Sequence, residues 1–139
     1  MSKRKINFWI ITVVGSVAFA WMIAELFRVL SEQRNPAGLA AIASDGVVEH
    51  KIGELMVGVP FVAILALSNL WNVNRIYQII RYARPLMIVG GILNALAWFN
   101  LGDRIPATDF LRIWCLIIFA FGLIGAWLLG RLVEKNAAP

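Results

Sequence analysis

The sequence predicts an all-α integral membrane protein in which four transmembrane helices form an antiparallel bundle. Of its 139 residues, 60% are hydrophobic and only 15% are charged, whereas a soluble domain carries about 25% charged residues. The chain also has four apolar segments that reach the length of about 17 to 25 residues needed to cross a membrane. We therefore expect a single four-span domain over residues 1–139, with short connections and one longer external loop.

The first predicted span covers residues 6–27 and contains no charge before Glu25. The basic residues before it and the stretch Ala18-Phe19-Ala20 resemble a signal peptide with its cleavage site. However, the apolar run continues through residues 21–24, which gives it the length of a membrane span. We therefore expect a retained transmembrane helix.

The second predicted span covers residues 55–73, contains no charge, and includes Pro60, which is expected to bend it. Before this span lies the external loop, residues 31–54. In that loop the stretch 35–38 is a turn signal and residues 39–43 are expected to form a short interfacial helix.

The third predicted span covers residues 85–101 and the fourth covers residues 110–130. Pro85 suits the first turn of a helix, where its missing N–H is not needed. The fourth span holds one charge, Arg112, near its beginning.

Basic residues predict the orientation, because short cytoplasmic connections are enriched in Lys and Arg. One side of the predicted membrane receives eight of them: Lys3, Arg4, Lys5, Arg75, Arg81, Arg84, Arg131 and Lys135. The other side receives five: Arg28, Arg34, Lys51, Arg104 and Arg112. This asymmetry places both termini in the cytoplasm, with a bacterial inner membrane as the expected location. The net charge of +5 then reflects topology, and no nucleic-acid partner is predicted.

The segment 68–85 is predicted to be the cytoplasmic corner between spans two and three. Its aromatic residues are expected to anchor at the interface, and Arg75, Arg81 and Arg84 are candidate contacts for anionic lipid headgroups. Four apolar residues share one helical face, which predicts that span two continues as an amphipathic helix: Ile76, Ile79, Ile80 and Ala83. A dedicated site for a partner or a lipid is the alternative interpretation of this corner.

Four polar residues are candidates for intramembrane or substrate-lining roles: Glu25, Asn69, Asn72 and Asn94. Arg28 lies three positions after Glu25, which favours an interfacial ion pair over a proton or cation site. The three amides are expected to form hydrogen bonds between helices, and a polar lining for a substrate or a quinone headgroup is the alternative.

Small residues recur every fourth position in three of the spans. The candidate helix-packing residues are Ser16, Ala20, Gly91, Ala95, Gly122 and Ala126. Because small side chains let helix backbones approach closely, these faces are predicted either to seal the bundle or to bind another subunit.

Catalytic and metal-binding patterns are not apparent. The only cysteine, Cys115, cannot form an internal disulfide. The only histidine, His50, is expected to be a solvated loop residue, and its spacing from Asp45 and Glu49 fits no metal signature. We predict no catalytic residue, no metal and no cofactor.

These observations favour a non-enzymatic accessory subunit or assembly factor that packs within a larger inner-membrane complex. The expected partners are membrane lipids and either another membrane protein or further copies of the chain. Two alternatives remain open. One is a small oligomeric transporter or channel, and the other is a lipid- or quinone-binding membrane protein.

Overall fold

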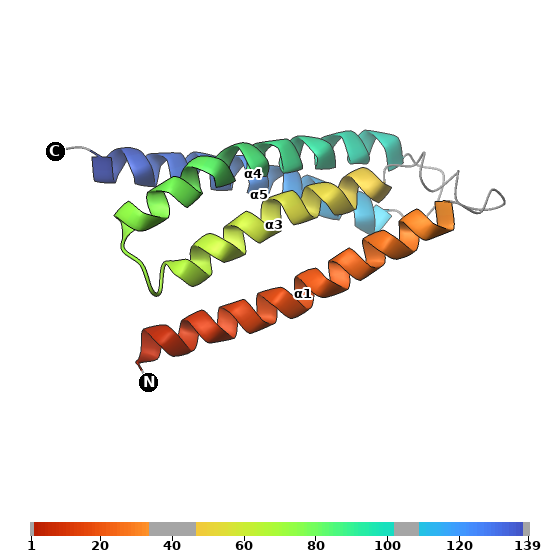
Figure 1. Cartoon of the computed structure of the whole chain (residues 1–139). Helices are drawn as coiled ribbons and strands as arrows, with labels where there is room; N and C mark the ends of the chain where they lie inside the picture. The colour runs from red at the N-terminus through yellow and green to blue at the C-terminus, as the bar shows by residue number, and fades with distance from the viewer. Residues whose placement is uncertain (1, 34–46, 102–108, 138–139) are drawn as a thin grey trace.

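The computed structural model describes residues 2–33, 47–101 and 109–137. These residues form four helices, shown in Figure 1: α1 (Lys3–Gln33), α3 (Val47–Leu67), α4 (Val73–Leu101) and α5 (Asp109–Ala137). Each helix is long and apolar enough to cross a membrane. The predicted all-α fold with four transmembrane-length helices is thus confirmed.

Helix α3 begins and ends earlier than the span predicted from the sequence. It starts at Val47 rather than at residue 55, and it ends at Leu67 rather than at residue 73. The prediction counted Glu49, Lys51 and Glu54 as residues of the external loop, because charge is costly in hydrocarbon. In the structure the first helical turns carry these polar residues, and Glu54 is paired within the helix.

Helix α4 includes the segment that was predicted to continue span two. It starts at Val73, so Pro85 lies inside the helix rather than in its first turn. The turn between the helices is formed by residues 68–72 and includes a 2.9 Å hydrogen bond from the Leu70 amide to the Leu67 carbonyl. The Asn72 side chain then accepts a 3.2 Å hydrogen bond from the Arg75 amide, which is the geometry of a helix N-cap.

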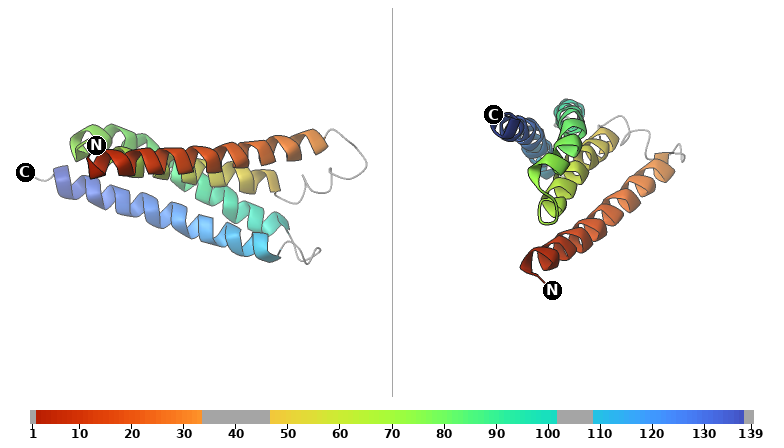
Figure 2. Two further views of the ribbon diagram at one scale, coloured as in Figure 1. Left: turned by 90° about the horizontal axis from the view of Figure 1, so that it is seen from below. Right: turned by 60° about the vertical axis from the view of Figure 1, so that its left-hand side comes forward.

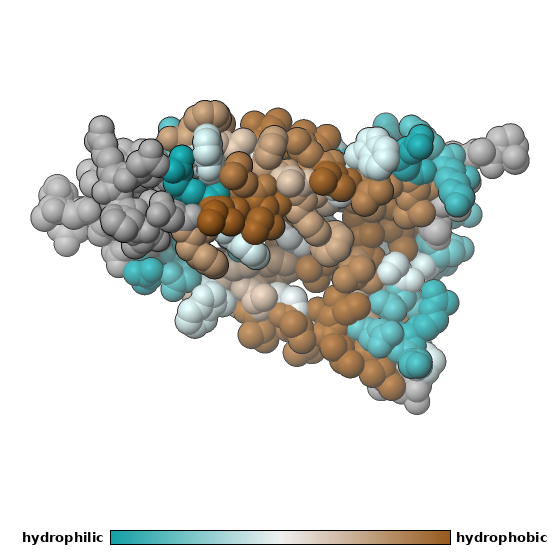
Figure 3. Space-filling model, turned by 180° about the vertical axis from the view of Figure 1, so that it is seen from behind, coloured by the Kyte–Doolittle hydropathy of each residue, from teal (hydrophilic) through white to brown (hydrophobic). Residues whose placement is uncertain are grey.

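Three of the helices pack closely together, and α1 packs against them less extensively. Helix α4 packs against both α3 and α5, while α1 packs mainly against α3. The right-hand view of Figure 2 shows α1 on the outside of the group of three, with α3 as its nearest neighbour. Only 6% of the apolar stretch of α1 is buried, compared with 28% to 33% in the other helices. Figure 3 shows hydrophobic side chains over the middle of one face, with hydrophilic residues gathered toward the ends.

Small residues form the contact between α4 and α5. A Cβ atom added to Gly122 would lie 2.6 Å from the Met87 carbonyl oxygen and 3.2 Å from the Gly91 Cα. Ala126 is 1% exposed, and Ala95 is partly buried. The small-residue faces predicted for spans three and four therefore meet within the chain.

Unlike the small residues of α4 and α5, two small residues of α1 are not buried between helices. Ser16 and Ala20 are exposed, and α1 contacts α3 through the neighbouring Gly15 and Phe19. A Cβ atom on Gly15 would lie 2.7 Å from Val62 Cγ1. Ser16 lines a small crevice between α1 and α3, and neither Ser16 nor Ala20 is buried by the described residues. The predicted turn at 35–38, the short helix at 39–43 and Asp45 lie outside the described residues.

Candidate functional site

A buried polar cluster lies where α3, α4 and α5 meet. His50 comes from α3, Asn94 from α4 and Cys115 from α5, and each is at most 2% exposed. Glu54, one helical turn after His50, extends this cluster toward the surface with a side chain that is 23% exposed. We call these four residues the polar cluster.

The distances within the polar cluster define its hydrogen bonds. His50 Nδ1 lies 2.7 Å from Asn94 Oδ1 and 3.2 Å from Cys115 Sγ. On the other side of the ring, His50 Nε2 lies 3.2 Å from Glu54 Oε2. Asn94 Nδ2 donates a 3.0 Å hydrogen bond to the Gly90 carbonyl, so the amide oxygen is the atom that faces the imidazole.

This arrangement determines where the protons lie. Asn94 Oδ1 can only accept, so His50 Nδ1 must carry a hydrogen and donate it. Nε2 faces a carboxylate oxygen, and one further proton is held between His50 and Glu54. The pair is neutral overall whether this proton resides on the ring or on the carboxyl group. A neutral pair with satisfied hydrogen bonds avoids most of the cost of placing charge in a membrane interior.

Two glycines make room for the polar cluster. A Cβ atom on Gly53 would collide with the Asn94 amide, and one on Gly90 would lie 2.6 Å from the Gly53 carbonyl oxygen. Backbones of α3 and α4 therefore approach closely at the level of Asn94. Neither glycine belongs to the four-residue repeats identified in the sequence.

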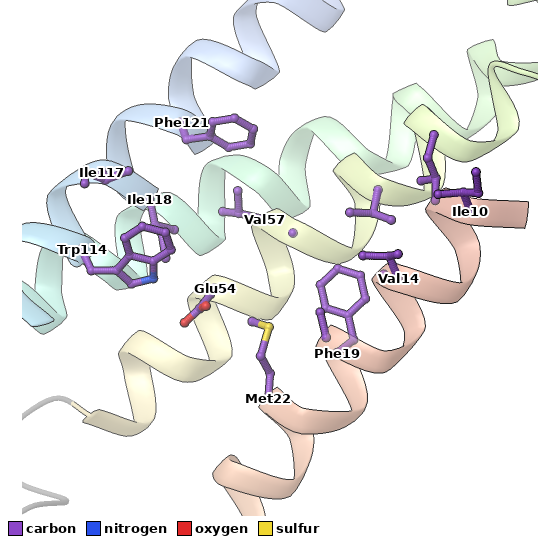
Figure 4. A pocket seen from close by; sticks show the side chains of 15 residues that line it. Ile10, Val14, Phe19, Met22, Glu54, Val57, Trp114, Ile117, Ile118 and Phe121 are labelled. Carbon is purple, nitrogen blue, oxygen red and sulfur yellow. The ribbon is translucent and has the colours of Figure 1, made fainter. Parts of the chain in front are cut away.

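An apolar crevice of about 540 Å³ opens beside Glu54, between α1, α3 and α5. Figure 4 shows its side chains, which include Phe19 and Met22 from α1. Glu54 is the only ionisable residue among those that line it. The indole nitrogen of Trp114 is turned toward the Glu54 carboxylate. The crevice thus has apolar walls and a single carboxylate that connects it to the buried histidine.

The expectation that His50 is a solvated loop residue was wrong. It is 2% exposed and lies inside α3. The sequence could not reveal this burial, because the ring's partners Asn94 and Cys115 are 44 and 65 positions away. One local signal was present: Glu54 follows His50 at the spacing of one helical turn, which suits a pair on a helix.

The other candidate polar residues lie elsewhere. Glu25 Oε2 and Arg28 Nη2 are 2.8 Å apart on α1, as expected for an ion pair near the helix end. Asn69 donates a 3.0 Å hydrogen bond to the Leu65 carbonyl, and Asn72 caps α4. These two amides therefore act locally in the turn at the opposite end of α3 from His50. Of the four candidates, Asn94 alone belongs to the polar cluster.

The three basic residues of the predicted cytoplasmic corner are divided between two cavities. Arg81 and Arg84 line one of about 290 Å³. Arg75 lines another, together with Arg4 and Trp71. The three residues therefore do not form a single basic cavity.

Among the residues that the structure describes, no group of three or more His, Cys, Asp or Glu side chains could hold a metal ion. Within the polar cluster, Cys115 and Glu54 approach opposite nitrogens of the His50 ring. The chain matches no protein-family model, no curated protein and no solved structure.

Proposed function

We propose that this protein binds a lipid-like amphiphile from within the bilayer. The apolar chain of the ligand occupies the crevice between α1, α3 and α5, and its headgroup lies at Glu54. The observation that carries this proposal is the crevice itself, whose apolar lining contains one carboxylate held by a buried histidine.

The dimensions of the crevice suit a hydrocarbon chain. Its volume of about 540 Å³ lies within the range of about 300 to 1,000 Å³ that is typical of ligand pockets. Its lining on α1 extends from Ile10 to Met22, which corresponds to about 18 Å at the helical rise of 1.5 Å per residue. That length is more than half of the bilayer's hydrocarbon thickness of about 30 Å.

The chemistry at Glu54 favours a neutral headgroup that donates a hydrogen bond. Glu54 Oε2 is engaged by His50, and the carboxylate has further lone pairs that can accept. A hydroxyl group, as in a long-chain alcohol or a hydroquinone, supplies the required donor. A carboxylate or phosphate headgroup has no hydrogen to donate to Glu54, and no basic side chain among the described residues lines the crevice to offset its charge.

Photo-crosslinking in nanodiscs tests this proposal. Two probes of equal chain length, each with a diazirine in the chain, are used: a long-chain alcohol and the matching fatty acid. We expect the alcohol to crosslink to residues of the crevice about tenfold more efficiently than the acid, a difference of about 1.4 kcal/mol. Ala18→Phe, which fills the crevice, should abolish the signal, and Glu54→Gln should reduce the preference for the alcohol.

Val17→Phe is the matched control, because Val17 is 67% exposed on the same helix and does not line the crevice. It should crosslink as the natural protein does. Equal crosslinking of the Ala18→Phe and Val17→Phe variants would show that the ligand binds elsewhere.

A second candidate function is that of an accessory subunit or assembly factor in a larger membrane complex. It is favoured by the exposed small-residue face of α1, where Ser16 and Ala20 leave room for the close approach of another helix. Gentle extraction at native abundance should then recover a large partner in stoichiometric amount, and Ala20→Leu should release it. Recovery of a homo-oligomer alone would instead favour a small transporter or channel.

We also propose that the protein resides in a bacterial inner membrane with both termini in the cytoplasm. The basic asymmetry supports this orientation, and so does the position of both termini at one end of the molecule (Figure 1). Arg4 Nη2 donates a 3.3 Å hydrogen bond to the Ser68 carbonyl, which joins the N-terminal end of α1 to the turn between α3 and α4.

Cysteine labelling tests the orientation in a Cys115→Ser background. Cysteines replacing Lys3 and Ala137 should react with a membrane-impermeant reagent only after the cytoplasmic side is exposed. A cysteine replacing Arg104 should react in intact cells. Labelling of positions 3 and 137 from the outside would contradict the proposed topology.

A further inference from the structure

A second cavity, of about 290 Å³, lies between α4 and α5 toward the predicted cytoplasmic side. Tyr77, Arg81 and Arg84 form its polar part, and Ile88 and Val133 contribute apolar walls. The residues from α4 follow one another by three or four positions, so they lie on one face of the helix. No acidic side chain is among the residues that line this cavity.

Arg84 is fixed in place by the backbone of α5. Its Nε donates a 2.8 Å hydrogen bond to the Ala126 carbonyl, and its guanidinium group passes over Gly130. A Cβ atom at Gly130 would collide with that group, so the glycine provides the space that it occupies. Arg84 also lines the cavity, and a guanidinium held in this way is suited to bidentate contact with a phosphate.

The depth of Arg84 indicates what kind of anion it meets. Arg84 precedes the end of α4 at Leu101 by 17 residues, or about 26 Å at the helical rise. With a hydrocarbon thickness of about 30 Å, Arg84 lies near the inner boundary of the hydrocarbon rather than in bulk water. A cation at this depth is stabilised by an anionic partner, and lipid phosphates lie just beyond that boundary.

We propose that this cavity binds the phosphate headgroup of an anionic phospholipid, with Arg81 and Arg84 as its two donors. The apolar walls favour a lipid over a free phosphate ion, because they extend the cavity toward the acyl region. Arg75 is not part of this site, since it lines a different cavity. The proposal is independent of the amphiphile crevice, which shares no lining residue with this cavity and is lined by a carboxylate.

Native mass spectrometry of the full chain in detergent tests this site. Phosphatidylglycerol and phosphatidylcholine with identical acyl chains are the probes. We expect the natural protein to bind phosphatidylglycerol more tightly, and Arg81→Gln and Arg84→Gln each to lower that affinity about tenfold. Arg75→Gln is the matched control, because it removes the same charge from the same helix and should change the affinity less than about twofold.

Arg81 is exposed, so Arg81→Gln tests the site even if Arg84→Gln impairs folding. Arg84→Lys adds a further test, because it keeps the charge but loses the Nε anchor and the forked geometry; we expect it to weaken binding as Arg84→Gln does. Equal losses for Arg75→Gln and Arg81→Gln would overturn the proposal in favour of general surface attraction. Displacement of phosphatidylglycerol by an equal concentration of soluble glycerol phosphate would also overturn it, because the site would then recognise the phosphate alone.

Discussion

Helix α1 and the three-helix group of α3, α4 and α5 have similar apolar compositions but pack in very different ways. In the three-helix group, glycine backbones touch and buried polar side chains bridge all three helices. Helix α1 buries only 6% of its apolar stretch. Lipid tails are as apolar as these side chains, so hydrophobicity alone does not drive helices together in a membrane. Close association instead depends on matched small residues and on hydrogen bonds, both of which α3, α4 and α5 have.

Leucine substitutions in the two regions should differ most in their effect on the stability of the folded protein. Even the Cβ of alanine at Gly122 would lie 2.6 Å from the Met87 carbonyl oxygen, and overpacking of this kind costs about 1 to 3 kcal/mol. Gly122→Leu should cost more and prevent folding. Ala20→Leu, on the exposed face of α1, should leave the melting temperature of the isolated chain unchanged.

Thermal unfolding of the purified variants in detergent, followed by size-exclusion chromatography, measures this contrast. If Gly122→Leu melted like the natural protein, the close contact between α4 and α5 would be refuted. A large loss for Ala20→Leu in the isolated chain would show that the Ser16 and Ala20 face packs against protein.

Removal of the Asn94 amide should lower the stability of the folded protein by an intermediate amount. Asn94→Leu leaves His50 Nδ1 without its 2.7 Å acceptor, and an unsatisfied buried donor costs about 1 to 3 kcal/mol. Asn100→Leu is the matched control, because this amide is exposed on the same helix and its loss should cost less than about 0.5 kcal/mol. Equal stability of the two variants would mean that the polar cluster does not hold the three helices together.

The sequence was sufficient to predict the four helices, because long apolar runs have few alternatives in a membrane protein. It was not sufficient to predict the boundaries of α3. Glu54 counted against a span when considered alone, and its cost falls only when His50 pairs with it. Likewise, Pro85 suits the first turn of a helix, although α4 continues through it.

The polar cluster was predicted only in part, because the burial of its residues depends on contacts that the local sequence does not show. Asn94 was identified because an amide inside an apolar run is conspicuous. His50 and Cys115 were not, since their burial results from contacts between helices that are far apart in sequence. The crevice also depends on the angle at which α1 meets α3, and no local pattern encodes that angle.

The smallest effect is expected for ion transport, where we predict no flux at all. An ion pathway requires polar groups through the full thickness of the hydrocarbon. The polar cluster lies near one end of the three-helix group, and the core next to it is apolar: Val57, Met87 and Ile118 are each at most 7% exposed. Asn94 is 0% exposed, so it cannot line a pore at an interface between copies of the chain.

Protein reconstituted in liposomes should therefore show the same proton and potassium fluxes as empty liposomes, measured with a pH-sensitive dye and a potential-sensitive dye. Flux that exceeds this background and is lost in a folded Glu54→Gln variant would mean that the carboxylate serves a transport path, and the closed polar cluster described above would then be only one state of a transporter.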